Sequence, residues 1–295
     1  MQNFKKKYHF WRFYFTTRNI RKNFPFYKIK SIEETINEVI ANHKSLSRFG
    51  DGEFRLILEN SNIGFQSGSS EMTTKLREVI QSNLDNHIIA LPETFSLKNG
   101  LNWRVKYWWL NFINNVGIQT TPFLDADKIY GNAFITRFYL DYEQKEQIPY
   151  HINNLKKIWD KQDILIVEGK YSRLGVGNDL FENSNSIQRI LCPEKNAFKN
   201  YESILKESKK YGENRLILIA LGPTATIMAH DLAKEHFWAL DIGHIDLEYM
   251  WYLKGEKVKT PVEGRLVNET EEQQSVEIPE RFRKSYLESI ILDVS

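Results

Sequence analysis

The segment from Arg48 to Phe54 reads RFGDGEF and places two carboxylates two residues apart, beside an arginine and two glycines. The oxygens of Asp51 and Glu53 are hard ligands that suit Mg²⁺ or Mn²⁺, cations that keep waters and bind phosphates at their open positions. Arg48, together with Arg173 further along the chain, can hold phosphate oxygens in a bidentate manner. The same letters fit a β-hairpin, because Asp-Gly is a favoured turn between apolar arms. Spacing alone leaves both interpretations open.

Glycines, carboxylates, arginines and a histidine follow four apolar runs of strand length. These residues are Gly50, Asp51 and Glu53 after residues 45–49; Glu168, Arg173, Gly175, Asn178 and Asp179 after residues 163–167; Gly222 and Thr224 after residues 215–221; and Asp241, His244 and Asp246 after residues 237–240. Ligands of open parallel sheets bind outside the carboxyl ends of the strands. We therefore expect these side chains to share one crevice.

The stretch that begins at Gly222 reads GPTAT and has the chemistry of a helix start. Glycine lets the chain leave a strand sharply, and Pro223 suits the first helical turn. The free N–H groups of such a helix can bind an anion such as a phosphate. An ordinary capped helix is the alternative interpretation.

Several other site classes are excluded by their missing residues. The stretch GVGNDL has Leu180 where a dinucleotide-binding fingerprint needs its third glycine. The chain contains no GxxxxGK[ST] phosphate loop and no GxSxG nucleophile elbow. One cysteine and seven scattered histidines supply no zinc-ligand spacing.

The hydrophobic pattern predicts an α/β fold with a Rossmann-like, mostly parallel sheet flanked by helices. Near-continuous apolar runs at 163–169, 187–193, 215–222 and 237–243 indicate strands buried on both faces. Residues 45–49 and 87–91 are further predicted strands. Predicted helices span about 31–42, 70–82, 97–117, 200–211 and 223–236. In the aromatic-rich helix at 97–117, Trp103, Tyr107 and Leu110 share a face that we expect to be core rather than a platform on which a sugar stacks.

Composition indicates a globular protein of a reducing compartment. The chain has 295 residues, of which 41% are hydrophobic, and its single cysteine, Cys192, excludes an internal disulfide. No run reaches the roughly 18 apolar residues of a membrane span, and charges interrupt the N-terminus where a signal peptide needs an apolar core. We expect a cytoplasmic protein, with contact at the inner face of the membrane left open, and no nucleic-acid partner.

Three regions differ in charge: a basic aromatic arm at 1–30, one predicted folded domain at 31–254 and a polar tail at 255–295. The arm holds nine of the 40 Lys and Arg residues and no acid, which leaves 31 basic against 38 acidic side chains elsewhere. Its interleaved rings and cations suit an anionic membrane surface. The alternative is a first helix that packs its rings on the body. The apolar end of the tail, residues 286–292, is expected to dock on the domain.

Six ordered blocks of this sequence resemble one known family. They are SRFGDGEF, YGNAFITR, VEGKYSRLGVGNDLF, IQRILCPEKNAF, ALGPTATIMAHDLA and LDIGHIDLEYMW. The chain resembles the glycosyltransferases with the GT-D fold, first catalogued as a domain of unknown function and known from the glycosylation of bacterial serine-rich-repeat adhesins. The resemblance covers most of residues 31–254. It implies a single Rossmann-like domain, a UDP-sugar donor, a saccharide acceptor, and a D-x-E motif for Mn²⁺ or Mg²⁺ that falls on Asp51 and Glu53.

The mechanism expected from this resemblance is transfer of a hexose, glucose or galactose, to a glycan or glycoprotein hydroxyl. An inverting enzyme needs a base for the acceptor proton. Asp246 is the first candidate and Asp241 the second, with His244 beside them. Donor contacts are expected from Arg48, Gly50, Glu168, Arg173, Gly175, Asn178, Asp179, Gly222 and Thr224. Glu248 is expected to form an ion pair.

Two other functions use the same features. A metal-dependent sugar-phosphate or nucleotidyl transferase would use the same carboxylates but would release pyrophosphate or consume a phosphate. A non-catalytic glycan-binding subunit of a glycan-assembly complex would not need Asp51 and Glu53 at all.

Overall fold

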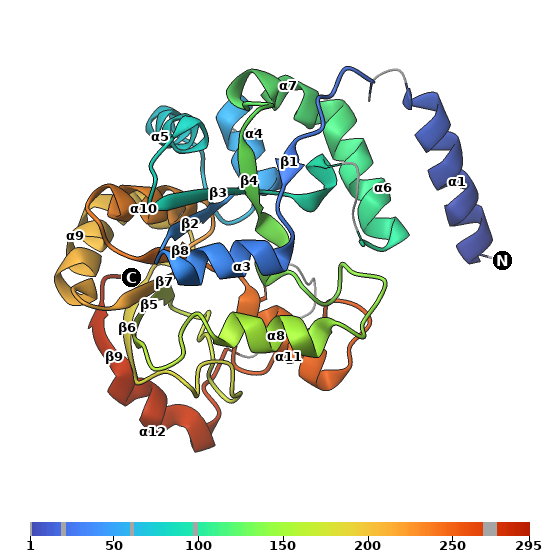
Figure 1. Ribbon diagram of the computed structural model, residues 1–295. Coiled ribbons are helices and arrows are strands. Elements are labelled where there is room, and N and C mark those ends of the chain that lie inside the picture. The colour runs from blue at the N-terminus through green and yellow to red at the C-terminus, as the bar shows by residue number, and fades with distance from the viewer. Residues whose placement is uncertain (1, 19–21, 60–61, 97–99, 268–275) are drawn as a thin grey trace.

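The computed structural model describes residues 2–18, 22–59, 62–96, 100–267 and 276–295 (Figure 1). Its strands are β1 Lys28–Ile29, β2 Ser45–Arg48, β3 His87–Leu91, β4 Ile129–Asn132, β5 Asp163–Gly169, β6 Ser186–Cys192, β7 Leu216–Ala220, β8 Ala239–Asp241 and β9 Ile290–Asp293. Its α-helices are α1 Gln2–Thr16, α3 Ile32–Ala41, α4 Asp51–Glu59, α5 Ser70–Gln81, α6 Trp103–Phe112, α7 Ile118–Thr120, α8 Ile148–Lys156, α9 Tyr201–Gly212, α10 Pro223–Lys234, α11 Ile245–Lys254 and α12 Glu280–Ser289.

The strands of the described residues form one nine-stranded sheet in the order β1-β4-β3-β2-β8-β7-β5-β6-β9. Every pairing between these strands is parallel. The predicted α/β class with a parallel sheet is therefore confirmed. β3 and β4 follow β2 toward one edge of the sheet, whereas β5 and β6 lie in the other half of the sheet. The crevice of such a sheet is expected where the order reverses, near β2, β8 and β7.

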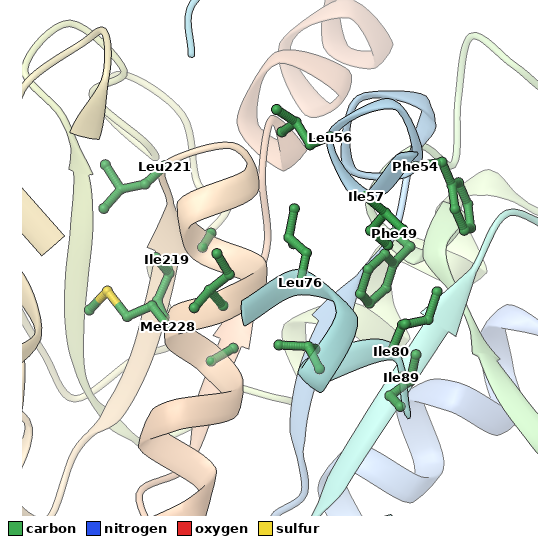
Figure 2. Close-up of a cluster of buried hydrophobic side chains, with 14 of the residues drawn as sticks. Phe49, Phe54, Leu56, Ile57, Leu76, Ile80, Ile89, Ile219, Leu221 and Met228 are labelled. Carbon is green, nitrogen blue, oxygen red and sulfur yellow. The ribbon is translucent and has the colours of Figure 1, made fainter. Parts of the chain in front are cut away.

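Two hydrophobic cores lie on the two faces of the sheet, because side chains alternate along each strand. In β5, Ile164 and Ile166 belong to the core under α3, α8 and α11, whereas Leu165 and Val167 belong to the core under α4, α5, α9 and α10. Figure 2 shows part of the second core, in which Leu76 of α5 lies between the side chains of α4 and those of α10. This packing on both faces explains the continuous apolar runs of the central strands.

The predicted helices agree with the structure, with one difference in the aromatic helix. The helix expected from residue 31 is α3, whose N-cap Ser31 accepts from the Glu34 backbone N–H in a complete capping box. The helix expected at 97–117 starts at Trp103, and residues 97–99 lie outside the described part of the chain. Its buried face carries Trp109 and Phe112, while Tyr107 is exposed, so the predicted core face was wrong.

Both segments outside residues 31–254 contribute to the sheet. β1 pairs with β4, and Phe24 and Tyr27 before it are buried in the core. At the other end, β9 pairs with β6, which confirms that the tail docks on the body. The boundaries at residues 30 and 254 remain predictions, since the sheet continues past both of them. None of the helices in the described part of the chain is both long and apolar enough to cross a membrane.

Candidate active site

A crevice of about 670 Å³ opens at the carboxyl ends of the central strands. It lies beyond Arg48 of β2, Ala220 of β7 and Asp241 of β8, each the last residue of its strand. The structure brings seven of the predicted site residues to its wall. These are Arg48, Gly50, Asp51, Glu53, Gly222, Asp241 and His244.

The RFGDGEF segment is a strand followed at once by a helix, so the hairpin interpretation was wrong. β2 ends at Arg48 and α4 begins at Asp51. Glu53 turns back and its Oε2 accepts a hydrogen bond from the Gly50 backbone N–H at 2.7 Å. Phe49 and Phe54, both fully buried, face each other across the helix start with ring centroids 5.9 Å apart. A glutamate at the third helical position and such an apolar staple are standard devices that fix a helix N-terminus.

Glu53 is a buried carboxyl group with two other carboxylates near it. Burial, the carboxylate of Asp241 and, to a smaller extent, that of Asp51 raise the pKa of Glu53 to about 7. Gly50 donates to only one of its two carboxylate oxygens. A cation or a cationic group of a ligand would lower the electrostatic cost of ionising Glu53.

Arg48 and Asp241 form the floor of the crevice as a buried ion pair. The Arg48 Nη2 lies 2.7 Å from Asp241 Oδ1, and its Nε donates to the Asp241 carbonyl at 2.8 Å. Thr136 Oγ1 accepts from Nη1 at 2.7 Å. Gly243 leaves room for the guanidinium, because a Cβ there would lie 2.1 Å from Nη2 and its φ is +46°. Arg48 is therefore already committed to Asp241, and its charge is neutralised there.

The N-terminus of α10 opens toward the crevice at Gly222. Gly222 adopts φ +56°, and a Cβ there would lie 2.4 Å from the Phe65 ring, so only glycine fits this turn. No side chain caps this helix start in the structure. Thr224 is fully buried and lies outside the crevice wall, whereas Thr226 Oγ1 donates to the Arg48 carbonyl at 3.0 Å. The backbone N–H groups of this turn are thus suited to an anion.

Glu168, one of the expected donor contacts, belongs to a buried ion pair. It is fully buried, lies 2.6 Å from Arg189 Nη1, and accepts from the Leu174 backbone N–H at 2.7 Å. Desolvation raises the pKa of this carboxyl, against the attraction of Arg189. This geometry ties β5 to β6 and to the loop after β5.

Asp246, predicted as the first candidate base, also has its oxygens engaged by the protein. Its Oδ2 lies 2.5 Å from Arg265 Nε, and its Oδ1 accepts from the Gly175 backbone N–H at 2.8 Å and from Asn178 Nδ2 at 2.7 Å. Only 2% of Asp246 is exposed. The structure thus places Asp246, Gly175 and Asn178 in one network outside the crevice wall, where they hold the 173–179 loop against the tail.

Arg173 and Asp179 are directed elsewhere in the same loop. The Arg173 guanidinium donates to the carbonyls of Gly264 and Val276 and so fastens the tail. Asp179 accepts from Lys156 and from the Tyr249 hydroxyl, each at 2.5 Å. Neither residue lines the crevice. These contacts hold the 173–179 loop to α8, α11 and the tail.

Sequence reasoning missed the other wall of the crevice. Its members include Arg104, Trp108, Arg137, Asp141 and Lys259. The first two come from α6, whose rings were assigned to the core, and the next two follow β4, a four-residue strand that was not predicted. The strand-end rule applied to residues 129–132 would have pointed to the segment that follows them.

The chemistry of the crevice fits a divalent cation held in an open site. Among the described residues, no group of three or more acidic, histidine or cysteine side chains forms a metal cage. Two carboxylates, those of Asp51 and Glu53, line the same crevice at one helix start. Mg²⁺ and related ions need only one or two carboxylates when substrate phosphates and waters complete the shell. A cation bound there would offset the burial and the repulsion from Asp241 that raise the pKa of Glu53.

Glu248 provides a pH-dependent stability prediction away from that site. It is 1% exposed, its Oε2 accepts from the backbone N–H groups of Tyr139 and Leu140, and burial raises its pKa from 4.5 to about 7. Between these two pH values the folded state binds more protons than the unfolded state, so the contribution of Glu248 falls as pH rises. Urea unfolding of wild type and Glu248→Gln should show the stability of wild type falling relative to the variant by about 3 kcal/mol between pH 4 and pH 8. Parallel pH profiles would contradict this.

The fold and site together define a class of protein: in its described residues, a single-sheet α/β domain with acidic and cationic side chains and the N-termini of several helices around one crevice. The model of the family named glycosyltransferase GT-D fold matches residues 46–270. The chain belongs to this family, which confirms the resemblance noted from the sequence blocks.

Curated relatives and solved structures agree with this membership. The chain is 38% identical over 234 residues to "Glycosyltransferase GlyD" of Streptococcus pneumoniae serotype 4, covering 79% of this chain and 28% of that protein. It is 35% identical over 252 residues to "Probable glycosyl transferase Gly" of Streptococcus gordonii, covering 84% of this chain and 36% of that one. The chain thus spans about a third of the length of these relatives.

Two solved structures share the fold over nearly their whole length. One, described as the highly conserved domain of unknown function 1792 with a distinct glycosyltransferase fold, has a TM-score of 0.87, 34% identity, and coverage of 93% of this chain and 98% of its own. The other, described as a new glycosyltransferase from Streptococcus sanguinis, has a TM-score of 0.84, 33% identity, and coverage of 91% and 100%.

Proposed function

We propose that this chain is a metal-dependent glycosyltransferase that moves a hexose, glucose or galactose, from a UDP-sugar to a saccharide acceptor in bacterial glycan or glycoprotein assembly. The observation that carries the proposal is the meeting of Asp51, Glu53, Gly222 and His244 at one crevice in a chain of this family. Asp51 and Glu53 would hold Mn²⁺ or Mg²⁺, which supplies positive charge to the diphosphate leaving group. The α10 N-terminus would bind a phosphate oxygen through its N–H groups.

Of the three candidate bases, His244 has the most suitable position. Asp246 lies outside the crevice wall, and Asp241 is paired with Arg48. In an inverting transfer, the acceptor hydroxyl oxygen forms a bond to the anomeric carbon while the bond from that carbon to the UDP oxygen breaks. The hydroxyl proton passes to His244, and the electron pair of the broken bond leaves with UDP. A neutral imidazole can accept such a proton near neutral pH.

Calorimetry with UDP-glucose, UDP-galactose and UDP-GlcNAc, with and without Mn²⁺, tests the donor class. We expect a hexose donor, UDP-glucose or UDP-galactose, to bind with Mn²⁺ and to bind at least 10-fold more weakly without it, since the metal joins carboxylates to diphosphate. Release of UDP in a turnover assay separates this function from a nucleotidyl transferase, which would release pyrophosphate. Absence of binding by all three donors would favour a non-catalytic glycan-binding subunit.

We also propose that α1 makes peripheral contact with an anionic membrane. Phe10 packs beneath the helix and, like Phe13, contacts the Tyr107 ring of α6, but Trp11 and Phe15 are 53% and 64% exposed. Exposed rings on a helix within a segment that has basic and no acidic residues fit the headgroup region of such a membrane. Packing on the body therefore accounts for one side of this helix only.

The double variant Trp11→Ser, Phe15→Ser should bind vesicles that contain phosphatidylglycerol about 10-fold more weakly, because it lacks two rings that would insert at the membrane interface. Co-sedimentation measures this, and Tyr150→Ser, which changes an equally exposed ring on α8, is the control. Equal binding by the double variant and wild type would refute membrane contact through α1. Point variants are preferable to removal of residues 1–30, since that removal would take the buried Phe24 and Tyr27 out of the core.

A further inference from the structure

Trp108 presents a large aromatic surface to the crevice. It lines the wall and is 46% exposed. Its ring stacks on Phe112 with centroids 5.8 Å apart and an interplanar angle of 10°, and it meets Trp109 edge-on at 5.0 Å. Phe112 and Trp109 are both buried, at 3% and 7% exposure. Two buried rings thus hold an indole that lines the crevice and keeps an exposed surface.

An exposed indole fixed in this way is suited to a ligand that has a flat apolar face and a polar rim. A pyranose ring has both, since its axial C–H groups form an apolar face while its hydroxyls surround it. Aromatic side chains bind such amphipathic partners by stacking, with hydrogen bonds formed at the edge. We propose that Trp108 is the stacking platform of the acceptor-saccharide subsite. This inference rests on the proposed function, because a transferase needs a second saccharide in the crevice beside the donor.

Arg104 strengthens the assignment of this wall to a saccharide. Arg104 and Trp108 are four residues apart on α6, so they lie on the same side of the helix, and both line the crevice. A guanidinium has five N–H donors and can bind several hydroxyls of a sugar that stacks on the neighbouring ring. A pyranose has an apolar face and a polar rim, and it can bind where an aromatic ring lies beside a group with several N–H donors.

The opposite side of the crevice offers much less room. A smaller cavity of about 40 Å³ adjoins the crevice there, shares Gly222 and His244 with it, and is lined by Ser172, Glu194 and Asn196. A cavity of that volume has room for a few water molecules at most, so a saccharide does not fit in it. This cavity lies at the ends of β5, β6 and β7, whereas α6 lies beside the segment that follows β3. With the diphosphate at the central strands, the α6 wall is the side that the acceptor can occupy.

Saccharide and nucleotide binding are measured separately to test this assignment. The probes are a glycan array with glucose, galactose and N-acetylglucosamine termini, and calorimetry with UDP and Mn²⁺. For the saccharides that wild type binds, Trp108→Ala should lower the affinity by about 10-fold. Trp108→Phe should keep most of the wild-type affinity, since a phenyl ring still stacks. Tyr150→Ala, which removes a 49% exposed ring outside the crevice, should bind as wild type does. The affinity for UDP with Mn²⁺ should stay unchanged in all three variants.

Three results would overturn the inference. Undiminished saccharide binding by Trp108→Ala would show that the indole carries no subsite. A loss of UDP affinity in Trp108→Ala would place the nucleoside on this wall instead. If wild type bound none of the saccharides, the α6 wall would not be a saccharide subsite. If the proposed function were wrong, wild type would not turn over a UDP-sugar. That result is measured separately from saccharide binding by the Trp108 variants, so the two failures are distinguishable.

Discussion

Replacing Asp51 with asparagine is expected to lower the rate of UDP-sugar turnover about 100-fold or more at saturating donor and Mn²⁺. Asp51 is the first residue of α4 and lines the crevice. A neutral amide is a weaker ligand for a divalent cation, and the leaving diphosphate loses charge stabilisation. The fold should tolerate the change, because an acidic residue in a first helical turn contributes only about 0.3–1 kcal/mol. The rate of UDP release measures the effect.

Two comparisons make that result specific. Asp127→Asn alters an exposed carboxylate between the helical turn 121–123 and β4 and should leave the rate unchanged. Glu53→Gln keeps an oxygen that can accept from the Gly50 N–H but removes the charge, so it should lose turnover while the start of α4 stays capped. Near-wild-type rates for both Asp51→Asn and Glu53→Gln would show that neither carboxylate serves the reaction.

The second large effect concerns stability. Asp246→Asn should destabilise the fold by about 3–5 kcal/mol, because it leaves the Arg265 guanidinium buried without its counter-charge. The two side chains lie 2.5 Å apart and are 2% and 5% exposed, respectively. Urea unfolding at pH 7 measures the loss. The variant that remains folded should bind UDP with Mn²⁺ as wild type does, since Asp246 lies outside the crevice wall.

An exposed pair in the same region serves as the control. Glu263 and Arg281 lie 3.6 Å apart with side chains that are 69% and 70% exposed, so Glu263→Gln should change stability by less than about 1 kcal/mol. If Asp246→Asn were as stable as wild type but failed to turn over donor, Asp246 would be the acceptor base that its sequence position suggested.

The sequence was informative about the strands because their burial leaves a local signature. The apolar runs at β5 and β7 have no polar interruption, since helices cover both faces of the sheet. The rule that ligands bind at the carboxyl ends of strands then brought Arg48, Asp51 and Asp241 together correctly, although they are far apart in the chain. Parallel strands make such distant residues neighbours without further information.

In RFGDGEF, a local signal for a helix start competes with the turn signal of Asp-Gly. Glycine tolerates the N-cap position, Glu53 stands at the third helical position, and Phe49 and Phe54 have the spacing of a hydrophobic staple. These features together predict a helix start. The Asp-Gly pair alone suggested a turn, and β2 has no antiparallel partner that a hairpin would need.

The roles of the buried acids were not accessible from the sequence. Glu168 and Asp246 follow strands as ligand-binding residues do, yet Arg189 and Arg265 neutralise them from other segments. Nothing in local spacing indicates such partners. The α6 helix shows the same limit, because its rings occur on more than one side, and only tertiary packing decides that Trp109 is buried while Trp108 faces the crevice.

The most direct test is the position of Mn²⁺ and UDP in crystals grown with both. Anomalous scattering from manganese should give a peak beside the carboxylates of Asp51 and Glu53, with the diphosphate of UDP next to it and toward Gly222 at the start of α10. A peak elsewhere, or UDP bound outside the crevice at the ends of β2, β7 and β8, would contradict the site.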